Sequence, residues 1–108
     1  MRGNYSEGYM LITGVMSDET VKRIHKITEG TNTEISIQPP AHQNVTQINI
    51  TVDRAGREDG YNTVDNIVDI IKEDEGVEGL YVDMINWVQG DDSYYREEKR
   101  KGDQTWQQ

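Results

Sequence analysis

Residues 46–53 read TQINITVD, and this stretch decides the fold because its polar and apolar side chains alternate without a break. Ile48, Ile50 and Val52 fall on one face of an extended chain, and polar residues occupy the positions between them. A period of two is the pattern of a strand that buries one face and exposes the other. The stretch therefore predicts a half-buried strand, and with it a sheet that needs a covering layer.

The covering layer follows directly in the sequence. After a turn-rich loop, the apolar residues Val64, Ile67, Val68 and Ile71 recur at the spacing of an amphipathic helix. Residues 77–88 then return to strand character. This predicts a helix packed on the sheet and a further strand after it.

The first half of the chain repeats this order. Residues 9–16 (YMLITGVM) predict a strand, and Ser17-Asp18-Glu19 supplies an N-cap and two acids for the first turn of a helix. Residues 33–38 alternate like residues 46–53, and Pro39-Pro40 forbids further strand pairing. We therefore expect residues 33–38 to form the second strand of the chain, at an edge of the sheet.

The element order predicts a ferredoxin-like βαββαβ fold of the α+β class, with two helices on one face of a four-stranded antiparallel sheet. Right-handed crossovers would make the first and third strands central and the second and fourth strands edges. This domain covers residues 9–88. Residues 1–8 form a polar N-terminal segment, and residues 89–108 form a polar C-terminal tail that we expect to be disordered or helical.

Composition limits the chain to one hydrophobic core, because 108 residues with 33% hydrophobic content do not supply two. Cysteine is absent, which excludes disulfides and thiol chemistry. No apolar run reaches the roughly 20 residues that span a bilayer, and Met1–Gly8 is polar. We therefore expect a cytoplasmic protein with no membrane association.

The charge is strongly negative and concentrated. The formal net charge is −9, and residues 58–78 hold eight acids against the single base Lys72. Such a charge repels phosphate backbones and argues against nucleic-acid binding. These acids form a candidate surface for a basic partner or for a protein that binds nucleic acid. Some of them recur at helical spacing and so form a stripe on one helix face. The members of this acidic surface are Glu58, Asp59, Asp65, Asp69, Glu73 and Asp74. A solvated helix face is the alternative interpretation.

A second candidate surface is the sheet face that carries no helices. The first and fourth strands are neighbours in the predicted topology, so their outward apolar and aromatic residues should meet. These are Tyr9, Leu11, Tyr81, Ile85 and Trp87. An exposed patch of this kind needs a partner. We expect a homodimer through this face, or cover by the tail with Trp106.

Two short stretches resemble known families. Residues 76–82 (GVEGLYV), after an amphipathic helix, resemble the end of small-molecule-sensing ACT domains, which implies a regulatory ligand-binding module. Residues 19–24 (ETVKRI) and 33–37 (TEISI) resemble part of a KH domain. The KH resemblance, or the topology of the RNA-recognition motif, implies RNA binding, with Lys22, Arg23 and Lys26 as phosphate contacts.

Residues suited to catalysis are few. His25 and His42 are the only neutral-pH bases, and neither lies in a recognised motif. We expect no enzyme, no cofactor and no metal site. The leading hypothesis is a small acidic protein-interaction module of the inhibitor or immunity type, as some phage proteins that imitate nucleic acid are. An RNA-binding domain and an ACT-like regulatory module are the alternatives.

Overall fold

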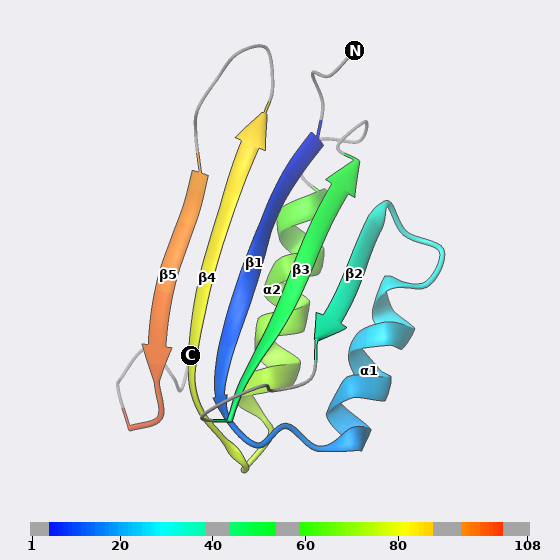
Figure 1. Ribbon diagram of the computed structural model, residues 1–108. Helices are drawn as coiled ribbons and strands as arrows, with labels where there is room; N and C mark the ends of the chain where they lie inside the picture. The colour runs from blue at the N-terminus through cyan, green and yellow to red at the C-terminus, as the bar shows by residue number, and fades with distance from the viewer. Residues whose placement is uncertain (1–4, 39–43, 54–58, 88–93, 103–108) are drawn as a thin grey trace.

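A computed structural model of the protein describes residues 5–38, 44–53, 59–87 and 94–102. These residues form strands and helices in the order β1 (Tyr5–Gly14), α1 (Asp18–Thr28), β2 (Thr33–Gln38), β3 (Val45–Asp53), α2 (Asp59–Lys72), β4 (Val77–Trp87) and β5 (Tyr94–Arg100) (Figure 1). The chain is therefore an α+β protein, as its pattern of residues predicts.

The five strands form one antiparallel sheet in the order β2-β3-β1-β4-β5. The predicted interior positions of β1 and β3 and the predicted edge position of β2 are confirmed. The prediction of a four-stranded sheet with a polar tail is wrong, because Tyr94–Arg100 form a fifth strand that pairs with Gly79–Ile85 of β4. Consequently β4 lies inside the sheet, and β5 is an edge.

There is a physical reason why the sequence pattern does not predict the fifth strand. Residues 94–100 read YYREEKR and contain no alternation of apolar and polar residues. A strand at the edge of a sheet can be held largely by its backbone ladder to one neighbour, with little apolar burial of its own. That ladder is a non-local contact, and hydrophobic periodicity does not reveal it.

Both helices lie on the same face of the sheet, as predicted, and no helix of the described residues lies on the opposite face (Figure 1). The helix α2 covers the middle of the sheet, and α1 lies beside it near β2. Within the described ranges, no helix is long and apolar enough to cross a membrane.

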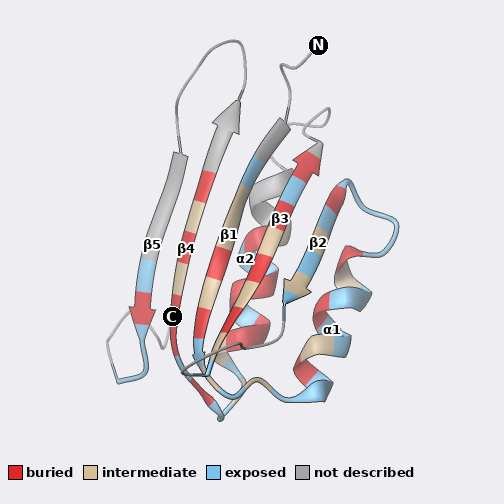
Figure 2. Cartoon of the chain, in the orientation of Figure 1, coloured by how far each residue is buried: buried red, intermediate tan, exposed pale blue. Residues whose placement is uncertain are grey.

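The hydrophobic core fills the space between the sheet and the helices (Figure 2). Alternate residues of the three inner strands and one face of α2 supply nearly all of it, and most of these side chains are completely buried. Its members are Met10, Ile12, Ile24, Ile48, Ile50, Val52, Val64, Ile67, Val68, Ile70, Ile71, Val77, Leu80, Val82 and Met84. The apolar residues at the strand period of two and those at the helical spacing thus pack into one core.

The first strand is longer than its apolar run. It begins at Tyr5 and not at Tyr9, because its polar first residues pair with both β3 and β4. Gly8 permits this double pairing. A Cβ atom at Gly8 would collide with the carbonyl oxygen of Asp83 and lie 2.7 Å from the Cα atom of Met84. The close approach of β1 and β4 therefore depends on glycine at this position.

Candidate functional site

The middle of the helix-free sheet face is aromatic and apolar. Leu11 of β1 lies directly opposite Tyr81 of β4, and Tyr9 lies opposite Asp83 two pairs further along. The rings of Tyr9 and Tyr81 are in contact, with centroids 6.2 Å apart and planes inclined by 39°. Tyr9, Leu11 and Tyr81 therefore lie together as predicted, and all three are half-buried although no helix of the described residues covers them.

The other two members of the predicted patch lie further along the same strand. Ile85 and Trp87 of β4 are paired with Glu7 and Tyr5 of β1. Their strand positions are described, but their side chains lie outside the described part of the structure. That any of these five residues binds a partner remains a prediction.

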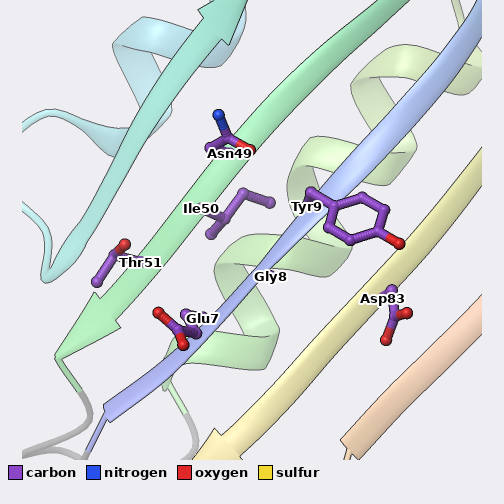
Figure 3. Close-up of a pocket in the computed structure, with 7 residues that line it drawn as sticks. All are labelled: Glu7, Gly8, Tyr9, Asn49, Ile50, Thr51 and Asp83. Atoms are coloured by element: carbon purple, nitrogen blue, oxygen red, sulfur yellow. The ribbon is translucent and has the colours of Figure 1, made fainter.

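Next to the aromatic pair, the face is hollowed over Gly8. The hollow has a volume of about 410 Å³, and it is lined by residues of three adjacent strands. These are Glu7, Gly8 and Tyr9 of β1, Asn49, Ile50 and Thr51 of β3, and Asp83 of β4. Figure 3 shows the ring of Tyr9 inclined toward β4, on the side of Asp83, whereas Asn49 and Thr51 lie on the other side of β1.

Hydrogen bonds fix the polar groups around the hollow. The hydroxyl group of Tyr81 donates to Oδ2 of Asp83 at 3.3 Å. On β3, Nε2 of Gln47 donates to Oδ1 of Asn49 at 2.8 Å. Glu7 is exposed, whereas Asp83 is half-buried. The hollow therefore combines a carboxylate in a hydrogen-bonded position with a second carboxylate that is open to solvent.

This set of groups is suited to a cation. Carboxylates form charge-assisted hydrogen bonds with ammonium and guanidinium groups, and the face of a tyrosine ring attracts the same cations. Among the described side chains that point from this face, the acids are Glu7, Glu34, Asp83 and Glu98, whereas the base is Arg100. Arg100 already forms an ion pair with Glu98 at 2.6 Å. The described side chains of this face therefore carry more acids than bases, and Arg96, whose side chain is not described, occupies the strand position opposite Asp83.

The predicted acidic surface is divided by the structure. Asp65 and Asp69 are exposed on α2, as the helical stripe predicts. Glu73 and Asp74, in contrast, interact with α1 of the same chain. Glu58 lies outside the described residues. Asp59 is the first residue of α2, and its side chain is not described.

Asp74 connects the two helices at the start of α1. Its Oδ2 atom accepts hydrogen bonds from the backbone amide of Ser17 at 2.8 Å and from the hydroxyl group of Thr20 at 2.7 Å. Its Oδ1 atom accepts one from the amide of Gly76 at 2.9 Å. Burial of the carboxylate opposes its ionisation, but these hydrogen bonds outweigh burial and lower the pKa of Asp74. Asp74 therefore has a structural role.

The predicted RNA contacts Lys22, Arg23 and Lys26 are all exposed on α1. Arg23 does not point to a free basic surface, because its Nη1 atom contacts Oε1 of Glu73 on α2 at 2.8 Å. Basic and acidic residues that are 50 positions apart in the sequence thus meet between the helices. The positive charge that a phosphate backbone would need is partly neutralised within the chain.

The predicted bases are not gathered into a site. His25 is exposed on α1, and His42 lies outside the described residues. Among the described residues, no group of three or more histidine, aspartate or glutamate side chains is arranged to hold a metal ion.

Comparisons with known proteins add no relative to this description. No protein-family model, no curated protein and no solved structure matches the chain. The geometry of the sheet face is therefore the basis for any functional inference.

Two charged residues of the hollow, Glu7 and Asp83, are not among the predicted site residues. Glu7 fell in the segment interpreted as a polar N-terminal extension, although it continues the alternation of β1. Asp83 occupies an outward position of β4, in phase with Tyr81, and this phase was visible in the sequence. Glu7 lies beside Tyr9 because the two are neighbours on one face of β1, whereas the approach of Asp83 to Tyr9 depends on the register of β1 against β4, which no local pattern specifies.

Proposed function

We propose that this chain is a non-enzymatic protein-binding module, a ferredoxin-like domain extended by a fifth strand, whose helix-free sheet face binds a positively charged segment of another protein. The observation that carries the proposal is the hollow beside the Tyr9–Tyr81 pair, which Glu7 and Asp83 flank with carboxylates. A lysine or arginine side chain of the partner would enter this hollow. The proposed compartment is the cytoplasm.

The two chemical components of the face have different roles in this proposal. Half-buried Leu11 and the tyrosine rings offer apolar area, which supplies affinity once water is excluded. The carboxylates select a cation, whose alkyl stem can lie along the rings. Long-range attraction comes from the net charge of −9, to which exposed Asp65 and Asp69 contribute on α2. Such steering raises the association rate and weakens with salt.

A basic partner fits this face better than a second copy of the same face. Two copies placed face to face would bring Glu7 and Asp83 of each against acidic groups of the other, and like charges in an interface are costly. An inhibitor or immunity-type role agrees with a basic target, since such targets include proteins that bind nucleic acid. The face would then occupy the target's cationic surface.

The RNA-binding and ACT-like alternatives predict different behaviour. RNA binding would depend on Lys22 and Lys26 and would be lost after nuclease treatment. An ACT-like module would gain thermal stability with a free amino acid.

The test is affinity capture with the immobilised chain from a nuclease-treated lysate of the source organism, in parallel for three forms. Glu7→Lys reverses a charge at the hollow, and Glu29→Lys makes the same change of net charge at an exposed residue of the helical layer. We expect the wild type and Glu29→Lys to retain the same protein at low salt, and Glu7→Lys to lose it. Equal capture by all three forms would show that the hollow is not the binding site.

A further inference from the structure

The middle of the helix-free face offers a partner side chains but few backbone groups. Each of the three inner strands, β3, β1 and β4, is paired with a neighbouring strand on both sides. Their amide and carbonyl groups therefore lie in the plane of the sheet and bond to the adjacent strands. A segment that covers the middle of this face must satisfy its own backbone hydrogen bonds.

A helix meets this requirement better than an extended segment does. An α-helix bonds its amides to its own carbonyls. An extended segment laid on the face would lose water from its amide and carbonyl groups, and each buried group left without a partner is destabilising. The amide side chains on β3 that could replace this water, Gln47 and Asn49, bond to each other at 2.8 Å. The other face of the same sheet is already covered by helices (Figure 1).

The exposed acids of the β1 and β2 side of this face lie in one row. Glu7 of β1 and Glu34 of β2 both pair with Thr51 of β3, which lies between them. Both glutamates are exposed. Because adjacent strands lie about 4.8 Å apart, the two acids are about 10 Å apart along the row. Arg96 and Arg100 belong to β5, two strands away from Glu7. This end of the face is therefore suited to basic residues of a partner.

The residues that follow Glu7 on the same face of β1 are apolar and aromatic. In order, they are Tyr9 and Leu11, and Figure 3 shows Glu7 and Tyr9 in this order along the strand. Successive residues on one face of a strand lie about 6.7 Å apart. Residues four positions apart in a helix lie about 6 Å apart along its axis. A helix parallel to β1 can therefore set one turn against each of these three residues.

We propose that the segment which binds this face is an amphipathic helix that lies along β1. Its basic residues occupy the turn over Glu7 and Glu34, and its apolar residues occupy the next two turns, over Tyr9 and Leu11. This inference rests on the proposed function, to which it adds the secondary structure of the partner and the order of its basic and apolar residues.

The experiment measures binding of the purified chain to a fluorescent synthetic peptide by fluorescence anisotropy. The helical peptide has about 16 residues, which is long enough for an alanine-rich helix, with lysines in the first turn and leucines on the same helix face in the next two turns. In the comparison peptide, proline replaces a central alanine of the opposite face, which breaks the helix and leaves the lysines and leucines in place. We expect the proline to weaken binding roughly tenfold or more, and circular dichroism to show that the helical peptide gains helix content when bound.

Charge reversal locates the peptide on the protein. The double variant Glu7→Lys/Glu34→Lys should lose the lysine peptide and should bind a version in which glutamates replace the lysines. The matched control Glu19→Lys/Glu29→Lys makes the same change of net charge at exposed residues of α1. This control should keep the lysine peptide and should not bind the glutamate version.

The outcomes separate this inference from the proposed function. Equal affinity for the helical and proline peptides, both lost in Glu7→Lys/Glu34→Lys, would overturn the helix and leave a basic segment as the partner. No binding of either peptide, or equal binding by the two double variants, would overturn the helix and the proposed function together. If Glu7→Lys/Glu34→Lys is folded by circular dichroism but does not bind the glutamate peptide, the placement along β1 is wrong.

Discussion

Replacing Asp74 by alanine should measure how strongly the two helices are tied together. The carboxylate accepts hydrogen bonds from Ser17, Thr20 and Gly76, so its removal leaves three donors without this acceptor. A hydrogen bond to a charged group contributes about 1.5–3 kcal/mol when buried. Asp74 is only half-buried, and water can replace part of each bond. We therefore expect Asp74→Ala to lower the free energy of unfolding by about 2–3 kcal/mol.

The assay is urea denaturation followed by circular dichroism, with Asp69→Ala as the matched control. Asp69 lies on the same helix and is exposed, so its replacement should change stability by less than about 0.5 kcal/mol. A loss of about 2–3 kcal/mol is a large share of the roughly 5–15 kcal/mol that stabilises a typical domain. If Asp74→Ala and Asp69→Ala were equally stable, the inferred connection between α1 and α2 would be refuted.

The pH dependence gives an independent check on the same carboxylate. Its pKa is lower in the folded protein than in the unfolded chain, so its ionised form favours folding. This stabilisation is complete above the unfolded pKa of about 3.9 and is lost as the pH falls through the lower folded value. The stability difference between wild type and Asp74→Asn should therefore shrink below about pH 4. A difference that stayed constant down to pH 2 would contradict the assignment.

Three other substitutions test the packing and the ion pair. Gly8→Ala should cost about 1–3 kcal/mol or more in urea denaturation, because the new Cβ would force β1 and β4 apart; unchanged stability would contradict the close approach. Ile67→Ala should cost about 2–5 kcal/mol and Ile67→Val only about 0.5–1.5 kcal/mol, since this side chain is completely buried; equal losses would place it outside the core. Arg23→Ala should lower the free energy of unfolding by less than about 1 kcal/mol, because the ion pair of Arg23 with Glu73 is exposed. A double-mutant cycle with Glu73→Ala measures the coupling energy of the pair. A coupling energy above about 1 kcal/mol would mean that the pair is shielded from water.

The local elements of this protein follow from local patterns. The period of two in residues 46–53 and the helical spacing of Val64, Ile67, Val68 and Ile71 correspond to β3 and α2. Ser17 caps α1 as predicted, since its side chain accepts a hydrogen bond from the amide of Thr20. Each of these features depends on residues within one or two turns of each other, so neighbouring side chains are sufficient to specify it.

The candidate site could be predicted only in part. The alternation of strand residues placed Tyr9, Leu11 and Tyr81 on the helix-free face, where the structure has them. The sequence pattern could not show that Glu73 and Asp74 contact α1, because each contact joins residues that are 50 or more positions apart. Charge density alone cannot separate a docking surface from an internal connection.

By itself, the sequence determined the α+β class, the single core, the helix-bearing face and the negative charge, because these depend on periodicity and composition. Only the tertiary structure decided the fifth strand and the hollow beside Tyr9. The charged residues 94–100 gain their strand conformation from the backbone ladder to β4. Asp83 lies opposite Tyr9 because of the register of β4 against β1. Pairing partners and register are non-local. The conformational entropy lost in closing the intervening chain is offset only by the contacts of the assembled sheet, so no local pattern specifies them.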